Sequence, residues 1–457
     1  MSDEQKENVK IFSADWVLPI SSEPIEKGAI AFTESRIISV GHESEILREF
    51  PNASVENFGE GAILPGLVNC HAHLELTSMR GFLDDVEADF FKWLMKLTVT
   101  RAEKLTEKDI ELSAIWGALE GARAGITCFG DIGRYGRAGF NALKINGLRG
   151  TAFQETDYSP FDEMADEDFA KLEEKYLALQ TDETALVKAG ISPHSPYTVS
   201  RRLFEKIADY ALLKNVRIST HAAESQMEED LMLHGTGAMA DFSRNRGVEI
   251  FSPRLSSIEY LNSIGVLQAK PLLAHCVKVG DAEIDLIKNS DSSVAHCPKS
   301  NAKFGHEIAP FEKFLSRKIR VGFGSDSVAS NNVCDILEEA RFAALLARTK
   351  TDKLVHLSAR EIIETATLGG AKAMRLENEI GSLEQGKQAD VTVVSLKNVA
   401  QFPVHDIYAA ILFASNARDV ELTMVAGEEI YRGGLPKKID EKALKTEIKA
   451  IAEKMMN

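Results

Sequence analysis

Cysteine and positive charge are both scarce in this sequence of 457 residues. An odd, scattered set of cysteines in a long chain is typical of reduced thiols and not of a disulfide framework. The chain has 53 Lys and Arg against 69 Asp and Glu, a net charge of -16. This balance argues against a nucleic-acid partner, because phosphates are bound by an excess of cations. The five cysteines are Cys70, Cys128, Cys276, Cys297 and Cys334.

Long apolar runs are also missing. The first residues, MSDEQKENVK, lack the apolar core of a signal peptide, and no run reaches membrane-spanning length. We therefore expect a cytoplasmic protein with no membrane partner. The hydrophobic share of 44% is still ample for a sizeable core. The length fits one large barrel with an appendage, or two to three domains.

The pattern of short apolar runs predicts a barrel between two β-rich ends. Residues 8–63 and 389–433 consist of short β segments with turns, which could pair into one small domain built from both termini. Between them, eight apolar runs alternate with helical patterns over roughly 300 residues, which predicts a (β/α)₈ barrel. We expect a composite β-sandwich from 1–63 and 384–435, a barrel over 64–383 and a C-terminal helix over 436–457. One face of that helix carries Leu444, Ile448, Ile451 and Met455.

Histidines and one aspartate fall at the predicted ends of these strands, where such barrels carry their catalytic groups. The first run ends at His71 and His73, which share one face if the strand is extended. An isolated His-x-His is more often an ordinary surface or core pair, but here VRIST ends at His221 and IRVGFGS at Asp326. Three imidazoles and a carboxylate suit Zn²⁺ or Fe²⁺ with a position left for water, whose pKa falls toward ~7. Other runs end at His194, His275 and His296.

Several motifs together resemble the amidohydrolase superfamily. PGLVNCHAH, THAAES, AHC, HCPKSN and GFGSDSVASNN occur in this order, as in the branch of cytosine, guanine and nucleoside deaminases and triazine hydrolases. The resemblance covers nearly the whole chain. It includes GSLEQGKQADVTVVS, which is similar to the segment by which the chain of that family leaves the barrel and re-enters the composite β-sandwich. It implies the metal-dependent TIM barrel and the sandwich formed by both termini that the apolar pattern predicts.

The resemblance also implies roles for particular residues. His275 matches the histidine that orients the attacking water, and Glu224 matches the glutamate that moves protons between water, ring nitrogen and leaving amine. The alternative for Glu224 is an acid favoured at a helix N-terminus by the dipole. No lysine ends the predicted fourth strand, so one metal is implied and not two. The implied ligands are His71, His73, His221 and Asp326, the last serving also as a base on the attacking water.

Two further stretches bear on the substrate. SPHSPYTVS is similar to methylthioadenosine and S-adenosylhomocysteine deaminases, in which His194 would contact the purine; capping of the next helix is the alternative. HAHLELTSMRG with the downstream DFFKWL resembles the aminofutalosine deaminases. Both imply attack of metal-bound hydroxide at adenine C6 with release of ammonia. The alternatives are a deaminase or chlorohydrolase of a free base or triazine, and a non-catalytic barrel, which retention of every ligand disfavours.

The chain departs from the nucleoside deaminases where they carry an acidic residue for the ribose. Here the stretch is LTVTRAEKLTEK, with Arg101 nearby and Glu103 shifted. Arg80, Arg101 or Arg134 could hold an anionic end of the substrate, or be solvated surface charges. Glu75 either contacts a ribose hydroxyl or braces its loop. We expect a small-molecule substrate and, from family habit, a homodimer or larger assembly. The expected substrate contacts are His194, Glu75, Arg101, Arg134 and Ser330.

Overall fold

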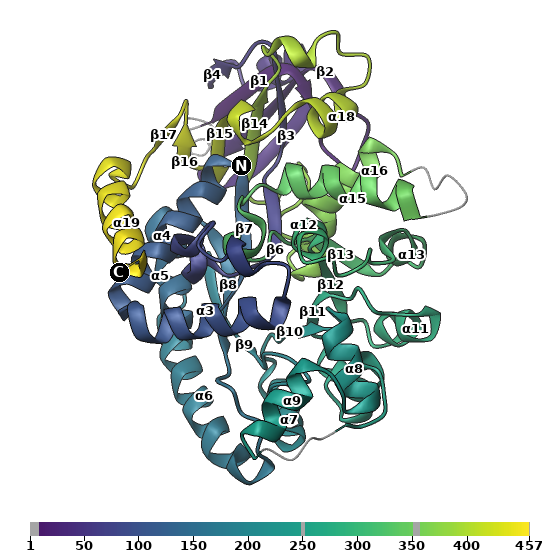
Figure 1. Cartoon of the computed structure of the whole chain (residues 1–457). Coiled ribbons are helices and arrows are strands. Elements are labelled where there is room, and N and C mark those ends of the chain that lie inside the picture. Colours follow the sequence, from purple (N-terminus) through teal and green to yellow (C-terminus); the bar gives the residue numbers. More distant parts are fainter. Residues whose placement is uncertain (1–8, 248–251, 351–356, 457) are drawn as a thin grey trace.

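A closed barrel of eight parallel strands forms the centre of the computed structural model, which describes residues 9–247, 252–350 and 357–456 (Figure 1). The strands form two four-stranded sheets, β6-β7-β8-β9 and β10-β11-β12-β13. Parallel bridges from Ile191 to Ile218 and from Ala72 to Asp326 join these sheets at both edges, which closes the barrel. The predicted (β/α)₈ fold is confirmed. The strands are β6 (Leu67–Ala72), β7 (Ile126–Gly133), β8 (Arg149–Glu155), β9 (Val187–Ser192), β10 (Ser219–Ala222), β11 (Leu272–His275), β12 (Ser293–His296) and β13 (Arg320–Phe323).

Helices cover the outside of the barrel. Strands buried on both faces become continuous apolar runs, as in β7, where every residue is buried. Helix α7 shows how the flanking helices form: the Ser200 side chain accepts the N–H of Leu203 at its start, and Asn215 ends it in a left-handed conformation. The helices along the barrel are α3 (Phe90–Lys104), α4 (Glu107–Arg123), α5 (Gly136–Asn146), α6 (Ala165–Thr181), α7 (Arg201–Lys214), α8 (Gln226–His234), α9 (Ala238–Asn245), α10 (Ser257–Ser263), α11 (Asp281–Asn289), α12 (Pro298–Lys303), α13 (Phe311–Ser316), α14 (Val328–Asn331), α15 (Ile336–Lys350), α16 (Ala359–Glu364) and α17 (Gly370–Ala373).

Both ends of the chain build one nine-stranded sheet, drawn in purple and yellow-green beside the barrel (Figure 1). Its order is β17-β16-β15-β14-β5-β1-β2-β3, with β4 paired to β1. Strand β5 from the N-terminal part lies antiparallel to β14 from the C-terminal part, with Leu64 opposite Thr392. Side chains from β1, β2, β5, β14 and β15 share one apolar core, so the sheet curls around it. The strands are β1 (Lys10–Val17), β2 (Ile25–Thr33), β3 (Arg36–His42), β4 (Ser54–Asn57), β5 (Gly61–Pro65), β14 (Val391–Ser395), β15 (Val420–Val425), β16 (Glu428–Arg432) and β17 (Leu435–Pro436).

This arrangement agrees with the predicted domain from both termini, and the limits 1–63, 64–383, 384–435 and 436–457 stay our proposal. Short helices α2 (Glu43–Glu49) and α18 (Ile407–Ala409) belong to the terminal segments. Helix α19 (Glu441–Met456) packs beside α4, with Leu444, Ile451 and Met455 buried. No helix within the described ranges combines the length and the apolar character that a membrane span requires. All five cysteines are buried free thiols, as expected.

Candidate active site

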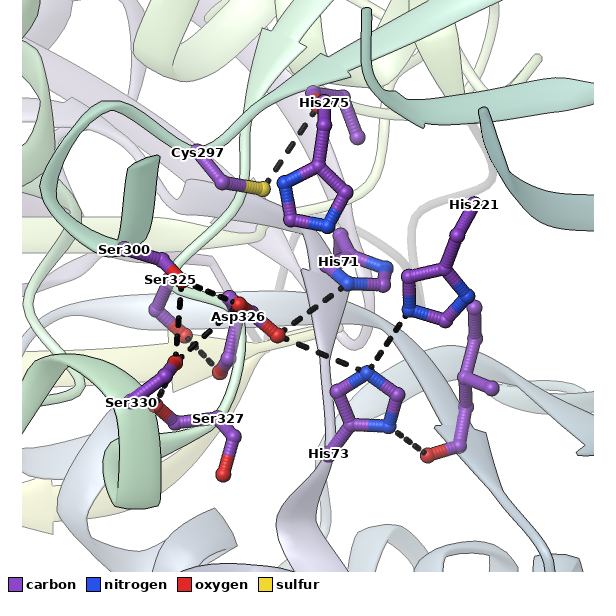
Figure 2. Close-up of polar contacts among 12 residues, drawn as sticks. His71, His73, His221, His275, Cys297, Ser300, Ser325, Asp326, Ser327 and Ser330 are labelled. Atoms are coloured by element: carbon purple, nitrogen blue, oxygen red, sulfur yellow. Dashed lines mark hydrogen bonds and ion pairs between the residues drawn. The ribbon is translucent and has the colours of Figure 1, made fainter. Parts of the chain in front are cut away.

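Four of the predicted residues meet at one end of the barrel, as Figure 2 shows. His71 lies on β6 with His73 just beyond it, His221 lies on β10, and Asp326 follows β13. The Nε2 atoms of His71 and His73 lie 3.4 and 3.5 Å from Oδ1 of Asp326. Nε2 of His73 lies 3.2 Å from Nε2 of His221. Strands far apart in the sequence therefore bring three imidazoles and a carboxylate together.

The orientation of these imidazoles fits a divalent metal ion. Nδ1 of His73 lies 2.9 Å from the carbonyl oxygen of Ile132, and Nδ1 of His221 lies 2.9 Å from that of His194. A carbonyl only accepts, so each Nδ1 carries the proton and each Nε2 presents a lone pair to the cluster. Within the described part of the chain, both ring nitrogens of His71 are buried and lack a well-formed hydrogen bond. Such nitrogens are costly to bury unless a ligand satisfies them.

Serines hold Asp326 in position. Its Oδ2 accepts hydrogen bonds from Ser300 Oγ at 2.5 Å and Ser330 Oγ at 3.1 Å, which leaves Oδ1 facing the histidines. Burial raises the pKa of Asp326, but the adjacent imidazole of His71 outweighs it and keeps the pKa well below the ordinary value. The hydroxyl of Ser330 is thus bonded to Asp326, and its contact with a substrate stays a prediction.

A second pair, Glu224 and His275, lies beside the cluster. Glu224 follows β10, and its Oε1 lies 3.7 Å from Nε2 of His275. Nδ1 of His275 lies 2.9 Å from Oδ1 of Asn301, which fixes the ring. Burial raises the pKa of Glu224 to about 7, although the charge of His275 opposes this rise. A carboxyl with that pKa can both donate and accept a proton near neutral pH.

A cavity of about 320 Å³ opens over these residues. Its polar lining includes Arg101, Arg134, Glu155 and His194. Apolar side chains, mainly from α3 and α9, line the rest of it. The cavity therefore suits a small molecule that carries both polar and apolar groups. The apolar residues are Phe90, Phe91, Trp93, Leu94, Met239 and Phe242.

His194 lies in the cavity wall. Its Nδ1 lies 2.7 Å from Thr198 Oγ1, so Nε2 is the nitrogen turned to the cavity. The alternative, that His194 caps the next helix, is wrong because Ser200 caps α7. His296, another histidine at a strand end, instead stacks on Phe311 with ring centroids 5.1 Å apart.

Arg101 and Glu75 form a buried ion pair, with Nη1 2.6 Å from Oε1. The second Glu75 oxygen accepts the backbone N–H of Tyr135 at 2.9 Å. These contacts favour the second of the two alternatives, in which Glu75 braces its loop, and its contact with a substrate stays a prediction. Arg101 does line the cavity, but Glu75 compensates its charge. Arg134 also lines the cavity, whereas Arg80 pairs with Glu120 elsewhere.

Sequence reasoning missed Glu155, Asn301 and His306. Glu155 ends β8, which corresponds to one of the eight predicted apolar runs, so a carboxylate at the end of a predicted strand was a usable signal. Asn301 and His306 follow β12, and Nε2 of His306 lies 3.8 Å from Oε1 of Glu224. No spacing rule links these two residues to Glu224 or His275, because a loop and α12 bring them there.

Comparisons with known proteins agree with this geometry. The Amidohydrolase family matches residues 62–430. A 5-methylthioadenosine/S-adenosylhomocysteine deaminase of Thermodesulfovibrio yellowstonii is 30% identical over 95% of this chain and 96% of its own length. A 5'-deoxyadenosine deaminase of Methanosarcina acetivorans is 28% identical over 94% of each chain. The zinc-bound crystal structure of an adenosine deaminase from Xanthomonas campestris has a TM-score of 0.87 and 26% identity, covering 98% of each chain. With the histidine and aspartate cluster, these findings support a divalent metal, and the chain belongs to the amidohydrolase family.

Proposed function

We propose that this chain is a metal-dependent hydrolytic deaminase of an adenine nucleoside, which replaces the 6-amino group by oxygen and releases ammonia. The observation that carries this proposal is Glu224, a buried carboxyl that lines the cavity beside the histidine cluster, with Oε1 3.7 Å from Nε2 of His275. The names of the relatives support an adenine nucleoside as substrate. Aminofutalosine, methylthioadenosine and S-adenosylhomocysteine are the candidate types.

We assign one metal ion per chain to His71, His73, His221 and Asp326, with Zn²⁺ favoured and Fe²⁺ as the alternative. Bound there, such an ion makes water nucleophilic at neutral pH. The four ligands come from β6, β10 and the end of β13, so the rigid barrel fixes their spacing. The serines on Oδ2 keep Asp326 from rotating away.

Glu224 moves the protons in this proposal. As the carboxylate it takes one proton from the attacking water and, as the acid formed in this way, donates that proton to the ring nitrogen next to C6. It then takes the second proton of the same water and passes it to the leaving amine, which departs as ammonia and leaves Glu224 as it began. His275 donates its Nδ1–H to Asn301, so its Nε2 is free to accept a hydrogen bond from the attacking water. Their separation of 3.7 Å leaves both groups facing the same small volume.

A panel of substrates under identical metal loading tests the proposal. Ammonia release is measured with aminofutalosine, methylthioadenosine, S-adenosylhomocysteine, adenosine and adenine, and with guanine, cytosine and a triazine. We expect a nucleoside to exceed every free base by at least ~10² in kcat/KM, because contacts to the remote end orient the ring. If a free base or a triazine is the best substrate by that margin, the assignment of a nucleoside substrate is contradicted, whereas the assignment as a hydrolase stands.

We also infer a cytoplasmic location, which the free, scattered cysteines support, and a homodimer or larger assembly, which rests on family habit alone. Light scattering coupled to size exclusion measures the mass in solution, and a monomeric mass of 50.2 kDa would contradict the assembly.

A further inference from the structure

Glu155 is a buried carboxylate that the proposed chemistry does not use. It ends β8, where Phe153 two residues earlier packs in the barrel interior, so Glu155 shares the inward face. The residue is 6% exposed and lines the cavity. Its Oε1 is buried and has no hydrogen-bond partner among the described residues. A buried acceptor without a partner costs free energy unless a ligand supplies a donor.

The position of Glu155 along the barrel indicates which part of the substrate it faces. Neighbouring strands run β8, β9, β10, so His194 on the β9 side lies between Glu155 and the strand that leads to Glu224. Glu155, His194 and His221 each place a polar atom within 4.8 Å of the others. In the proposed orientation, which places the six-membered ring at Glu224 with His194 beside it, Glu155 lies toward the glycosidic end of the nucleoside.

Two observations favour a hydrogen-bond donor over a second metal ion at Glu155. Nε of Arg134 lies 3.9 Å from Glu155 Oε2, so a positive charge already adjoins the carboxylate and opposes another cation. His221 Nε2 faces His73 at 3.2 Å, which commits that nitrogen to the metal cluster. Its Nδ1 donates to a carbonyl and is not available either.

We propose that Glu155 accepts hydrogen bonds from the sugar hydroxyls of the substrate and makes this enzyme selective for ribonucleosides. The inference rests on the proposed function. Two vicinal hydroxyls offer two donors, and a carboxylate has two oxygens to receive them. Glu75 cannot serve, because Arg101 and Tyr135 occupy both its oxygens. Glu103 lines the same cavity but is exposed, so water satisfies it in the absence of substrate.

The test compares adenosine with its 2′-deoxy, 3′-deoxy and 2′,3′-dideoxy analogues at fixed metal loading. The wild-type enzyme should favour adenosine over the dideoxy analogue by about 10- to 10²-fold in kcat/KM, because the analogue leaves a charged buried acceptor unpaired. Glu155→Gln should lower kcat/KM for adenosine by at least about 10-fold, mainly through KM, and leave the dideoxy analogue nearly unchanged. The matched change at an exposed carboxylate outside the cavity, Glu167→Gln on α6, should keep the wild-type preference.

Several outcomes would overturn the inference. An equal loss of kcat/KM on every analogue in Glu155→Gln would mean that Glu155 supports the structure or the chemistry and does not bind the sugar. Loss of a second bound ion in this variant, measured by metal analysis, would mean that Glu155 is a metal ligand. If that variant does not fold, the wild-type preference decides, because equal rates on all four nucleosides exclude a sugar-binding carboxylate. If the enzyme turns over nucleosides but shows none of these effects, the inference about Glu155 is rejected and the proposed function stands. If it turns over free bases or triazines and no nucleoside, both the proposed function and the inference are rejected.

Discussion

The ligand cluster and Glu224 differ in how a single substitution should act. His73 contributes one of the three imidazoles of the cluster, with Nε2 3.5 Å from Oδ1 of Asp326, and its Nδ1 is fixed by a backbone carbonyl. His73→Ala should therefore lose most of the roughly one transition-metal ion per chain that we expect, and nearly all activity. Metal analysis of the purified variant beside the wild type checks this. A fully active variant with no bound metal would reject the metal assignment.

Glu224 makes no part of the proposed ligand set, so its removal should separate chemistry from metal binding. Glu224→Gln keeps the shape of the side chain but cannot carry the proton. We expect unchanged metal content and a loss of about 10²-fold or more in kcat, since a general acid-base contributes about 10²–10⁴. The measurement is steady-state ammonia release on the best substrate of the panel. Unchanged kcat would place the proton transfer on another group.

The raised pKa of Glu224 also predicts how the stability of the metal-free protein depends on pH. Burial raises this pKa from 4.5 to about 7, so the folded state holds a proton that the unfolded state has lost between these values. Stability therefore falls as pH rises through that window, by up to about 3 kcal/mol. Metal-free Glu224→Gln should melt above the metal-free wild type at pH 8, and at the same temperature near pH 4. Equal melting at both pH values would contradict the burial of an ionisable Glu224.

At the scale of elements, the side chains at the strand ends of the site are packed closely against one another. Gly324 follows β13, and a Cβ added there would lie 2.7 Å from Cβ of His71 and 2.9 Å from Sγ of Cys297. Both neighbours are buried, so His71 has to shift. Gly324→Ala should lower activity by about 10²-fold, the cost of a small misplacement of a reacting group. In Gly41→Ala, the new Cβ meets nothing closer than 3.6 Å, and this control should keep activity. Equal activity in both variants would show that His71 tolerates the shift.

The same elements show what the sequence could and could not predict. Barrel strands are buried on both faces, so apolar runs marked all eight, and the rule of strand ends located His71, His221 and Asp326. The same rule applies to Glu155, which ends β8. Ser300 and Asn301 lie in the quoted motif HCPKSN, but their contacts with Asp326 and His275 could not be predicted, because α12 brings them together through tertiary packing. The left-handed conformations of His275 (φ 73°) and Asp326 (φ 54°) likewise depend on the closed barrel.

At the scale of the whole molecule, a buried ion pair joins the terminal sheet to the barrel. Arg149 at the start of β8 donates from Nε to Oδ2 of Asp390 at 2.8 Å and from Nη2 to Oδ1 at 3.0 Å. Asp390 Oδ1 also accepts the N–H of Ala426. Two further contacts cross the same boundary, from Thr392 and Thr423 to backbone carbonyls of the barrel. The two parts should therefore unfold together.

Asp390→Ala tests this coupling, because it leaves the Arg149 guanidinium buried without a partner. Breaking a buried pair from one side costs about 3–5 kcal/mol, whereas replacing both members by apolar residues is often neutral. We expect Asp390→Ala to lower the melting temperature strongly, and the double variant Arg149→Met, Asp390→Leu to recover most of it. Calorimetry should show one transition in the wild type. If Asp390→Ala instead melts in two steps with the catalytic barrel unaffected, the pair supports only the terminal sheet, and the barrel is stable without it.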